Sequence, residues 1–320
     1  MADKNQKTVD DLVARLKKST AMQSITMEQS VAKRLRKLKW DVVHSCYYVD
    51  PKESKLREID VTGKQVWSHQ INKDDYSTLR LHTVIECKSA KGFHILFACE
   101  SRGHTGSIHA QWLGARDSAH RIRLADTLSS LELNRTQINT IINHYNKLAY
   151  EDENLPTTKL HINTLPPKFH ASAFRETNIG SDKELEASVL WKAGLTLSSV
   201  VESFYEEFLF GVMDDIKLAS DMTLLYGDGN VVPAVIDELN LRGDLINLYH
   251  PIVVIDCALW SVKDSKPKPI QWCRLKQSNL DDFSDWWFDV VSYDYFDQYI
   301  TELTSFYNSQ LIGLGAKLLR

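Results

Sequence analysis

The chain has 320 residues, of which 43% are hydrophobic and 25% are charged, a composition typical of a globular protein that can bury a sizeable core. It contains no apolar run of about 18 residues, and residues 1–7 lack the apolar stretch of a signal peptide, so we expect no membrane association and a cytoplasmic location. The five cysteines form no Cys-Xaa-Xaa-Cys pair, which argues against zinc sites and disulfides.

Charge is distributed unevenly along the sequence. Residues 1–150 contain 24 Lys and Arg against 16 Asp and Glu, a net charge of +8, whereas residues 151–320 contain 14 against 26, a net charge of −12. A basic surface in the first half would attract phosphates. The alternative, an ordinary fluctuation together with one basic helix, stays open at this point.

The first predicted elements are a peripheral polar segment, residues 1–22, and a helix. Thr26 followed by Gln29 has the spacing of a capping box, so we expect the helix to begin there. Its apolar residues recur at helical spacing: Val31, Ala32, Leu35 and Leu38. Glu28 lies on the same stripe, so it either faces a partner inside the protein or sits in the first turn, where it favours the helix dipole.

Four strands are expected after this helix. They are predicted at residues 40–49, 56–61, 79–87 and 93–99, from their alternating or apolar runs and the turn residues between them. The polar stretch between the second and third strands is expected to be an exposed hairpin. Its Trp67 and His69 are candidate substrate contacts.

The residues with chemical potential lie at the ends of the second and third strands. Because a strand alternates its side chains, Glu86 and Lys88 project from one face while Ile85 and Cys87 pack behind them. If the strand that carries Asp60 pairs nearby, the Asp60 and Glu86 carboxylates converge, which is costly unless a cation lies between them. Such hard oxygen ligands suit a magnesium ion that keeps some of its waters.

This arrangement resembles the PD-(D/E)XK phosphodiesterase fold, also called restriction-endonuclease-like. The match consists of Asp60 near the end of one strand and Glu86-Cys87-Lys88 at the end of a later one, with Ile59 in the place of the usual proline. It covers roughly residues 25–100. The resemblance implies an α/β fold with a helix followed by a mixed, mainly antiparallel sheet, to which helical insertions and a C-terminal β/α extension are added.

The same resemblance implies a metal-dependent nuclease that hydrolyses phosphodiester bonds of nucleic acid, with DNA favoured. Asp60, Glu86 and Lys88 would be the catalytic residues, and Mg²⁺ or Mn²⁺ would be held by Asp60, Glu86, the backbone carbonyl of Cys87 and, through water, Glu28. Lys88 would position or deprotonate the attacking water, or neutralise the phosphate. Glu58 shares a strand face with Asp60 and is a rival ligand.

Four cations are weaker candidates for nucleic-acid contacts. Two lie on the basic helix and two beside the fourth strand: Lys33, Arg36, Lys91 and Arg102. No local motif fixes their roles, so a structural or incidental role remains the alternative for each.

The remainder is predicted to be an irregular connection at residues 151–181, a long aromatic helix at 182–213, three strands at 251–256, 270–275 and 286–291, and a closing helix at 294–314. Asp256 and Asp289 end or lie in two of these strands, but no lysine follows at the required spacing, so we expect structural roles for both. The expected organisation is a peripheral segment (1–22), a nuclease core (23–115), a helical region (116–215) and C-terminal strands with a helix (216–320).

An alternative function is a catalytically silent nuclease-fold protein that acts as a nucleic-acid-binding or protein-interaction module. The broad apolar stripe of the long helix would suit a homodimer. The presence of Asp60, Glu86 and Lys88 together favours the enzyme. DNA versus RNA, sequence specificity, endo- versus exonucleolytic action and biological setting stay open.

Overall fold

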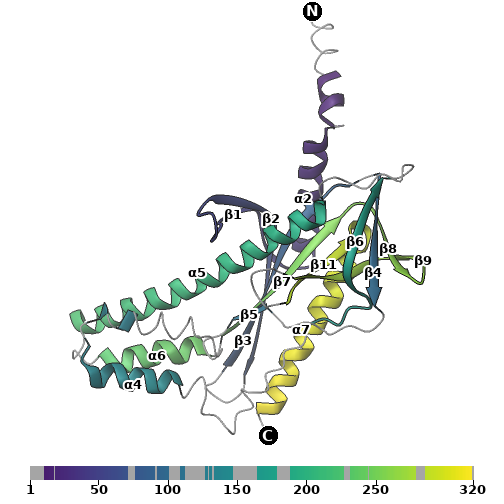
Figure 1. Ribbon diagram of the computed structural model, residues 1–320. Helices are drawn as coiled ribbons and strands as arrows, with labels where there is room; N and C mark the ends of the chain where they lie inside the picture. The colour runs from purple at the N-terminus through teal and green to yellow at the C-terminus, as the bar shows by residue number, and fades with distance from the viewer. Residues whose placement is uncertain are drawn as a thin grey trace, which may run out of the picture.

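The computed structural model describes residues 11–17, 19–70, 76–90, 92–100, 109–111, 127–128, 130–131, 133–146, 164–178, 188–226, 231–243, 245–278 and 285–318. In these ranges the chain forms one mixed sheet with helices on both faces (Figure 1). The strands are β1 (Asp41–Val49), β2 (Leu56–Gln70), β3 (Tyr76–Lys88), β4 (Phe93–Glu100), β5 (His109–Gln111), β6 (His170–Asn178), β7 (Leu245–Ile255), β8 (Ala258–Lys263), β9 (Lys266–Ile270), β10 (Trp272–Ser278) and β11 (Asp285–Ser292). The helices are α2 (Thr20–Lys37), α4 (Arg135–Asn146), α5 (Val189–Tyr226), α6 (Val231–Gly243) and α7 (Phe296–Leu318), and a 3₁₀ turn, η3 (Tyr293–Tyr295), precedes α7.

The sheet has the order β1-β2-β3-β7-β11-β10-β6-β4-β8-β9, and β5 pairs with β7. Its centre is parallel, because β7 pairs in parallel with β3 along its whole length and with β11 at its end. β1, β2 and β3 are joined by antiparallel pairing. The α/β class with a mixed sheet is therefore confirmed, and the carboxyl ends of β3, β7 and β11 meet at one edge.

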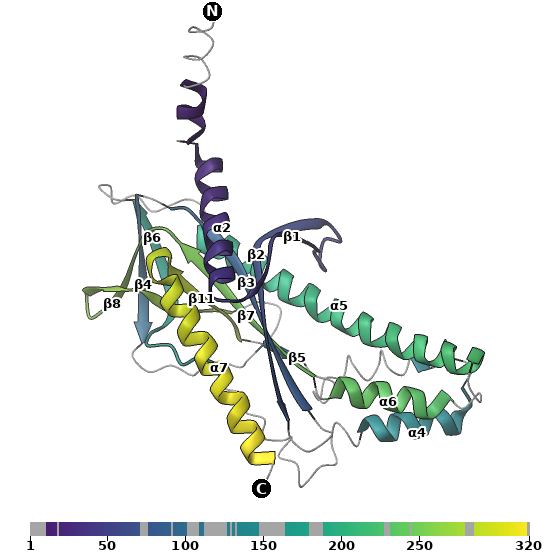
Figure 2. The ribbon, with the colours of Figure 1, turned by 180° about the vertical axis from the view of Figure 1, so that it is seen from behind.

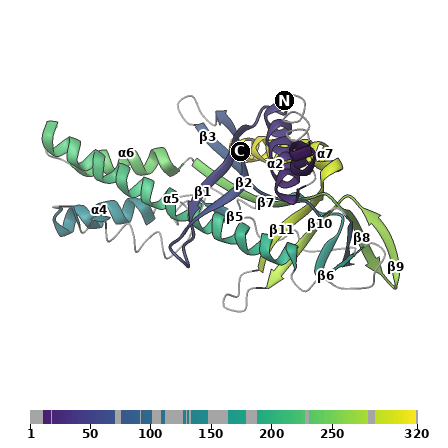
Figure 3. The ribbon, with the colours of Figure 1, turned by 90° about the horizontal axis from the view of Figure 1, so that it is seen from above.

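Two apolar clusters lie on the two faces of this sheet. On one face α2 and α7 pack together over the strands (Figure 2), with Leu35 and Tyr299 among the buried contacts. On the other face α5 covers the strands (Figure 3), with Leu197 among its buried residues. Neighbouring residues of β3 point to opposite faces of the sheet: Ile85 packs in the α2/α7 cluster and Val84 in the α5 cluster. By the same alternation Glu86 and Lys88 lie on the α5 side of β3.

A third cluster is separate from the sheet. The far half of α5 packs with α4 and α6 through Ile141, Val212, Ile216 and Val235, and these helices form an arm that extends away from the strands (Figure 1). Within the described ranges, no helix is both long and apolar enough to cross a bilayer.

The predicted start of the first helix is wrong. The N-cap is Ser19, whose hydroxyl accepts a hydrogen bond from the Met22 amide, so α2 begins at Thr20. The Thr26 hydroxyl instead donates to the Met22 carbonyl oxygen at 2.6 Å, as serine and threonine do inside helices. Glu28 consequently lies in the middle of α2, and the explanation by a first-turn dipole interaction is wrong as well.

Several other predicted boundaries also differ. The polar stretch expected between the second and third strands belongs to β2 and β3, which extend into a long hairpin because its outward residues are free to be polar. Trp67 packs partly buried against the α2/α7 cluster, while the side chain of His69 lies outside the described part. β6 occupies part of the expected irregular connection, and α5 continues beyond residue 213 because Ile216 extends its buried stripe.

Candidate active site

Glu86 and Lys88 meet at the end of β3. The Lys88 ammonium donates a hydrogen bond to Oε2 of Glu86, and Cys87 between them is buried in the α2/α7 cluster. This is the arrangement that strand alternation predicts. The Glu86 side chain is 5% exposed and that of Lys88 is 29% exposed, so the pair opens to solvent through the lysine.

Asp60 reaches the same point from the neighbouring strand. The last residue pair of the β2–β3 ladder is Val61 with Ile85. Asp60 and Glu86 are the next residue on each strand beyond that pair. Beyond it, Oδ2 of Asp60 accepts a hydrogen bond from the Cys87 amide at 2.6 Å. Because the N–H and C=O of one strand residue point to the same side, the Cys87 carbonyl faces the side of Asp60. Two carboxylates and one carbonyl oxygen are thus brought together.

The β-sheet is irregular around Asp60, both in the neighbouring strand β1 and in β2 itself. Ser45 of β1 has a left-handed φ of +56° and lies between the pairs His44–Val61 and Cys46–Ile59, opposite Asp60. Ile59 packs in the α5 cluster and Val61 in the α2/α7 cluster, although residues two apart in a regular strand face the same way. Left-handed conformations cost about 1–2 kcal/mol per non-glycine residue and concentrate at functional sites.

Glu28 approaches this group from α2. Its side chain is 12% exposed, accepts a hydrogen bond from the Ser24 hydroxyl at 2.9 Å, and lies 3.5 Å from Nε2 of His44. Its charge contributes to raising the pKa of both Asp60 and Glu86. The helix pattern therefore identified the inward direction of Glu28 correctly.

The carboxylates in this group are poorly compensated. Burial raises the pKa of Asp60, and the Lys88 ammonium and the Cys87 amide offset this only in part. Burial also raises the pKa of Glu86 to about 7, with Lys88 opposing and Asp60 adding to the shift. For Lys88, burial lowers the pKa but the charges of Glu86 and Asp60 and the hydrogen bond to Glu86 together more than offset it, so the pKa is raised. The group is therefore short of positive charge near neutral pH.

The donor chemistry limits which metal could bind here. Among the described residues, no group of three or more His, Cys, Asp or Glu side chains is arranged to hold a metal ion, so a closed cage of the kind that zinc or calcium takes is not formed there. Two carboxylates and a carbonyl are the smaller set that magnesium uses when waters or substrate phosphates complete its coordination. Asp60, Glu86 and the Cys87 carbonyl fit hydrated Mg²⁺ or the similar Mn²⁺.

Three further candidates, Glu58, Lys33 and Arg36, lie outside this group. Glu58 is solvent-exposed and acts on Asp60 through its charge. Lys33 and Arg36 lie exposed on α2, where Arg36 makes a long 3.4 Å contact with the Val42 carbonyl. Lys91 and Arg102 lie outside the described residues.

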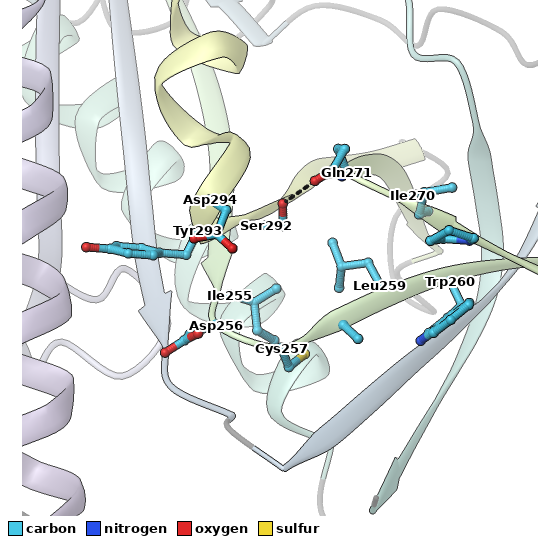
Figure 4. Close-up of a pocket in the computed structure, with 12 residues that line it drawn as sticks. Ile255, Asp256, Cys257, Leu259, Trp260, Ile270, Gln271, Ser292, Tyr293 and Asp294 are labelled. Carbon is cyan, nitrogen blue, oxygen red and sulfur yellow. Dashed lines mark hydrogen bonds between the residues drawn. The ribbon is translucent and has the colours of Figure 1, made fainter.

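A hollow of about 340 Å³ borders the end of β3. It lies past the carboxyl ends of β7 and β11, and the Asp256 amide at its rim donates to the Lys88 carbonyl at 3.1 Å. Figure 4 shows Leu259 pointing into the hollow and the Tyr293 ring pointing away, toward α2, where its hydroxyl bonds Ser30 at 2.5 Å. No sequence motif predicts this hollow, because three separate segments, 255–260, 269–271 and 292–294, line it together.

Asp289 belongs to a separate, fully buried network. Its carboxylate accepts hydrogen bonds from Nε and Nη2 of Arg274 at 2.8 and 2.9 Å and from the Tyr299 hydroxyl at 2.7 Å, and Nε2 of His250 lies 2.9 Å away. Arg274 also lies over the Trp287 ring, 3.9 Å from its centroid. This carboxylate is fully engaged by protein donors, which is a structural arrangement.

Comparison with known proteins found no matching family model, no similar curated protein and no similar solved structure. A functional conclusion therefore depends on the geometry and electrostatics of the group formed by Asp60, Glu86 and Lys88.

Proposed function

We propose that this chain is a metal-dependent nuclease with a restriction-endonuclease-like core, which hydrolyses phosphodiester bonds of nucleic acid and favours DNA. One observation carries the proposal: Asp60 and Glu86 converge where β2 and β3 end their pairing, with Lys88 bonded to Glu86. The raised pKa values of both carboxylates support it, because they describe a site that gains from a bound cation.

Each residue has a distinct role in this proposal. Asp60, Glu86 and the Cys87 carbonyl would hold Mg²⁺ or Mn²⁺, and Glu28 would contact it through water. The ion would supply Lewis-acid stabilisation of the phosphate and a more acidic water. Lys88, whose pKa is raised, stays protonated at neutral pH. Its ammonium would therefore orient the water and neutralise charge on the phosphate, and would not abstract a proton.

The test is cleavage of plasmid, linear duplex, single-stranded DNA and RNA with Mg²⁺ or Mn²⁺, and with a chelator as the blank. Asp60→Ala and Glu86→Ala should each abolish cleavage while the chain stays folded. Lys88→Ala should lower turnover with little change in metal affinity, measured by calorimetry, since an amine adjoins the metal without binding it.

Glu58→Ala is the matched control because it removes an exposed carboxylate two residues before Asp60. It should cleave like the unaltered chain. Undiminished cleavage by Asp60→Ala, at an equal melting temperature, would contradict the assignment. If Glu58→Ala were inactive instead, the rival ligand would be the correct one.

The alternative of a silent interaction module is favoured by a different observation. Four large apolar side chains on α5 are 44–60% exposed: Trp191, Leu195, Leu218 and Met222. Trp191 and Leu195 lie near the start of α5 and Leu218 and Met222 near its end, and exposed apolar side chains of this kind suit contact with a second copy. A chain inactive on every nucleic acid, with a mass that doubles as concentration rises in size-exclusion measurements, would support this function over the nuclease.

A further inference from the structure

A second pocket lies on the α5 face of the sheet. It has a volume of about 450 Å³ and is enclosed by the turn between β1 and β2 and by the first turns of α5. Its wall includes one phenol, three cations and two serine hydroxyls that matter here: Tyr48, Lys52, Arg57, Lys192, Ser198 and Ser199.

The acidic groups of this wall are already neutralised. Nε of Arg57 lies 2.8 Å from Asp50 and its Nη2 lies 2.9 Å from Glu53, which Lys55 also contacts at 2.9 Å. Neither Lys52 nor Lys192 has an ion-pair partner in the part of the chain that the structure describes. The pocket therefore carries two uncompensated ammonium groups.

Tyr48 lines this pocket and carries an unsatisfied hydroxyl donor. Its side chain is only 2% exposed, and its buried hydroxyl has no hydrogen-bond partner among the described residues. A buried polar group without a partner costs about 1–3 kcal/mol, and an exception of this kind calls for a ligand or another physical reason. Burial raises the pKa of Tyr48 to about 12, so the hydroxyl keeps its proton and can donate it to an anion.

Tyr48 also connects this pocket with the candidate active site. It packs in the α5 cluster together with Val84, on the face of β3 that carries Glu86. The charges of Asp50, Arg57 and Glu86 all act on its hydroxyl. The pocket and Glu86 thus lie on the same side of the sheet, and Tyr48, which lines the pocket, is near enough to Glu86 to feel its charge.

We propose that this pocket binds a backbone phosphate of the nucleic acid, flanking the phosphodiester held at Glu86 and Lys88, with the Tyr48 hydroxyl and the Lys192 ammonium as its main contacts. The proposal rests on the proposed nuclease function and names how the substrate is held. Two free ammonium groups and several hydroxyl donors match a phosphate, which offers charge and several acceptor oxygens. The pocket volume of about 450 Å³ is well above that of one phosphate, which leaves room for the nucleic-acid strand to pass through.

The first experiment measures binding without cleavage. A short fluorescein-labelled DNA duplex is titrated with the full chain in the presence of a chelator, over a range of salt concentrations. Lys192→Ala should weaken binding and reduce the slope of log K against log salt by about 1, because one phosphate contact is lost. Lys217→Ala is the control: it removes the same charge from an exposed position on the same helix, roughly 37 Å further along its axis, and should keep the slope.

The second experiment uses Tyr48→Phe, which removes only the hydroxyl. If the hydroxyl binds phosphate, the variant should bind DNA about 5- to 10-fold more weakly, as loss of one good hydrogen bond predicts. Its melting temperature without DNA should stay equal or rise, because an unpaired buried hydroxyl is gone. A purely structural role would give the reverse, a lower melting temperature with unchanged affinity.

The outcomes separate this inference from the nuclease proposal. DNA binding that depends on Tyr48 and Lys192 in a chain that cleaves nothing would keep the subsite and reject the nuclease. Cleavage by a chain in which Lys192→Ala and Lys217→Ala share one slope, and Tyr48→Phe binds normally, would reject the subsite alone. If inorganic phosphate stabilised the unaltered chain but not Tyr48→Phe, with DNA binding unaffected in both, the pocket would be a free-phosphate site and the inference would be wrong.

Discussion

Two buried carboxylates in the same sheet, those of Asp289 and Glu86, differ in how well protein donors compensate their charge. Asp289 of β11 is fully buried, yet the Arg274 guanidinium and further donors from His250 and Tyr299 surround it. Although burial raises it, these partners hold the pKa of Asp289 well below its usual range. Glu86 of β3 is nearly as buried and has one lysine, and its pKa is raised to about 7.

The difference lies in the number and fit of the donors. A planar guanidinium can satisfy both oxygens of one carboxylate, whereas one ammonium facing Glu86 and Asp60 cannot satisfy four oxygens. The first arrangement stabilises the fold. The second leaves negative charge that a metal ion could neutralise, and this uncompensated charge lowers the stability of the fold.

The largest effect is expected from breaking the satisfied group. Asp289→Asn leaves Arg274 charged and buried without a counter-ion, and should cost about 3–5 kcal/mol of unfolding free energy, measured by urea denaturation. Arg274→Met combined with Asp289→Asn removes both charges and should recover much of that loss. A loss below about 1 kcal/mol in the single variant would mean that the network does not stabilise the fold.

An effect of opposite sign is expected at Glu86. Its folded pKa is raised, so the folded chain binds more protons than the unfolded chain between about pH 4.5 and pH 7. Stability should therefore fall as pH rises through this window. Glu86→Gln removes the contribution of this residue to the dependence and, without metal at pH 8, should stabilise the chain by on the order of 1–3 kcal/mol while abolishing cleavage.

The measurement is urea denaturation at several pH values with a chelator present. Glu58→Gln, an exposed carboxylate on the adjacent strand, is the control and should stay within about 0.5 kcal/mol. Equal pH profiles for Glu86→Gln and the unaltered chain would show that Glu86 is well compensated and would remove the contrast with Asp289.

The smallest effect is expected at Glu28, which adds negative charge to the same group from α2. Glu28→Gln keeps the shape of the side chain and should change stability by less than about 1 kcal/mol, since the helix end is not involved. Cleavage should fall and recover in part at high Mg²⁺, followed as initial rate against metal concentration. Unchanged rates at low Mg²⁺ would place Glu28 outside the site.

The sequence predicted the local part of this comparison. The two-residue period of a strand was enough to predict that Glu86 and Lys88 lie together on the face opposite to Cys87. The helical period was enough to predict that Glu28 points inward. Both depend on geometry within one element. The start of α2 was missed because two Ser/Thr positions could each cap a helix, and Ser19 does so.

The long-range part could not be predicted in the same way. The partners of Asp289 come from β7, β10 and α7, and no residue spacing in the sequence predicts these contacts. The role of Tyr48 could not be predicted for a similar reason, because the pocket that it lines forms only where α5 covers the β1–β2 turn. The hairpin of β8 and β9, and helix α6, were missed because their sequences carry weak periodicity.

The parallel pairing of β3 with β7 has a consequence for how the protein is made. β3 ends at Lys88, but the strand that completes its other edge begins only at Leu245. At 5–20 residues per second, a ribosome needs roughly 8 to 30 seconds to cover that distance. Throughout this interval the strand that carries Glu86 and Lys88 is paired on one edge only, so the proposed site should not be complete in a nascent chain until β7 has been synthesised.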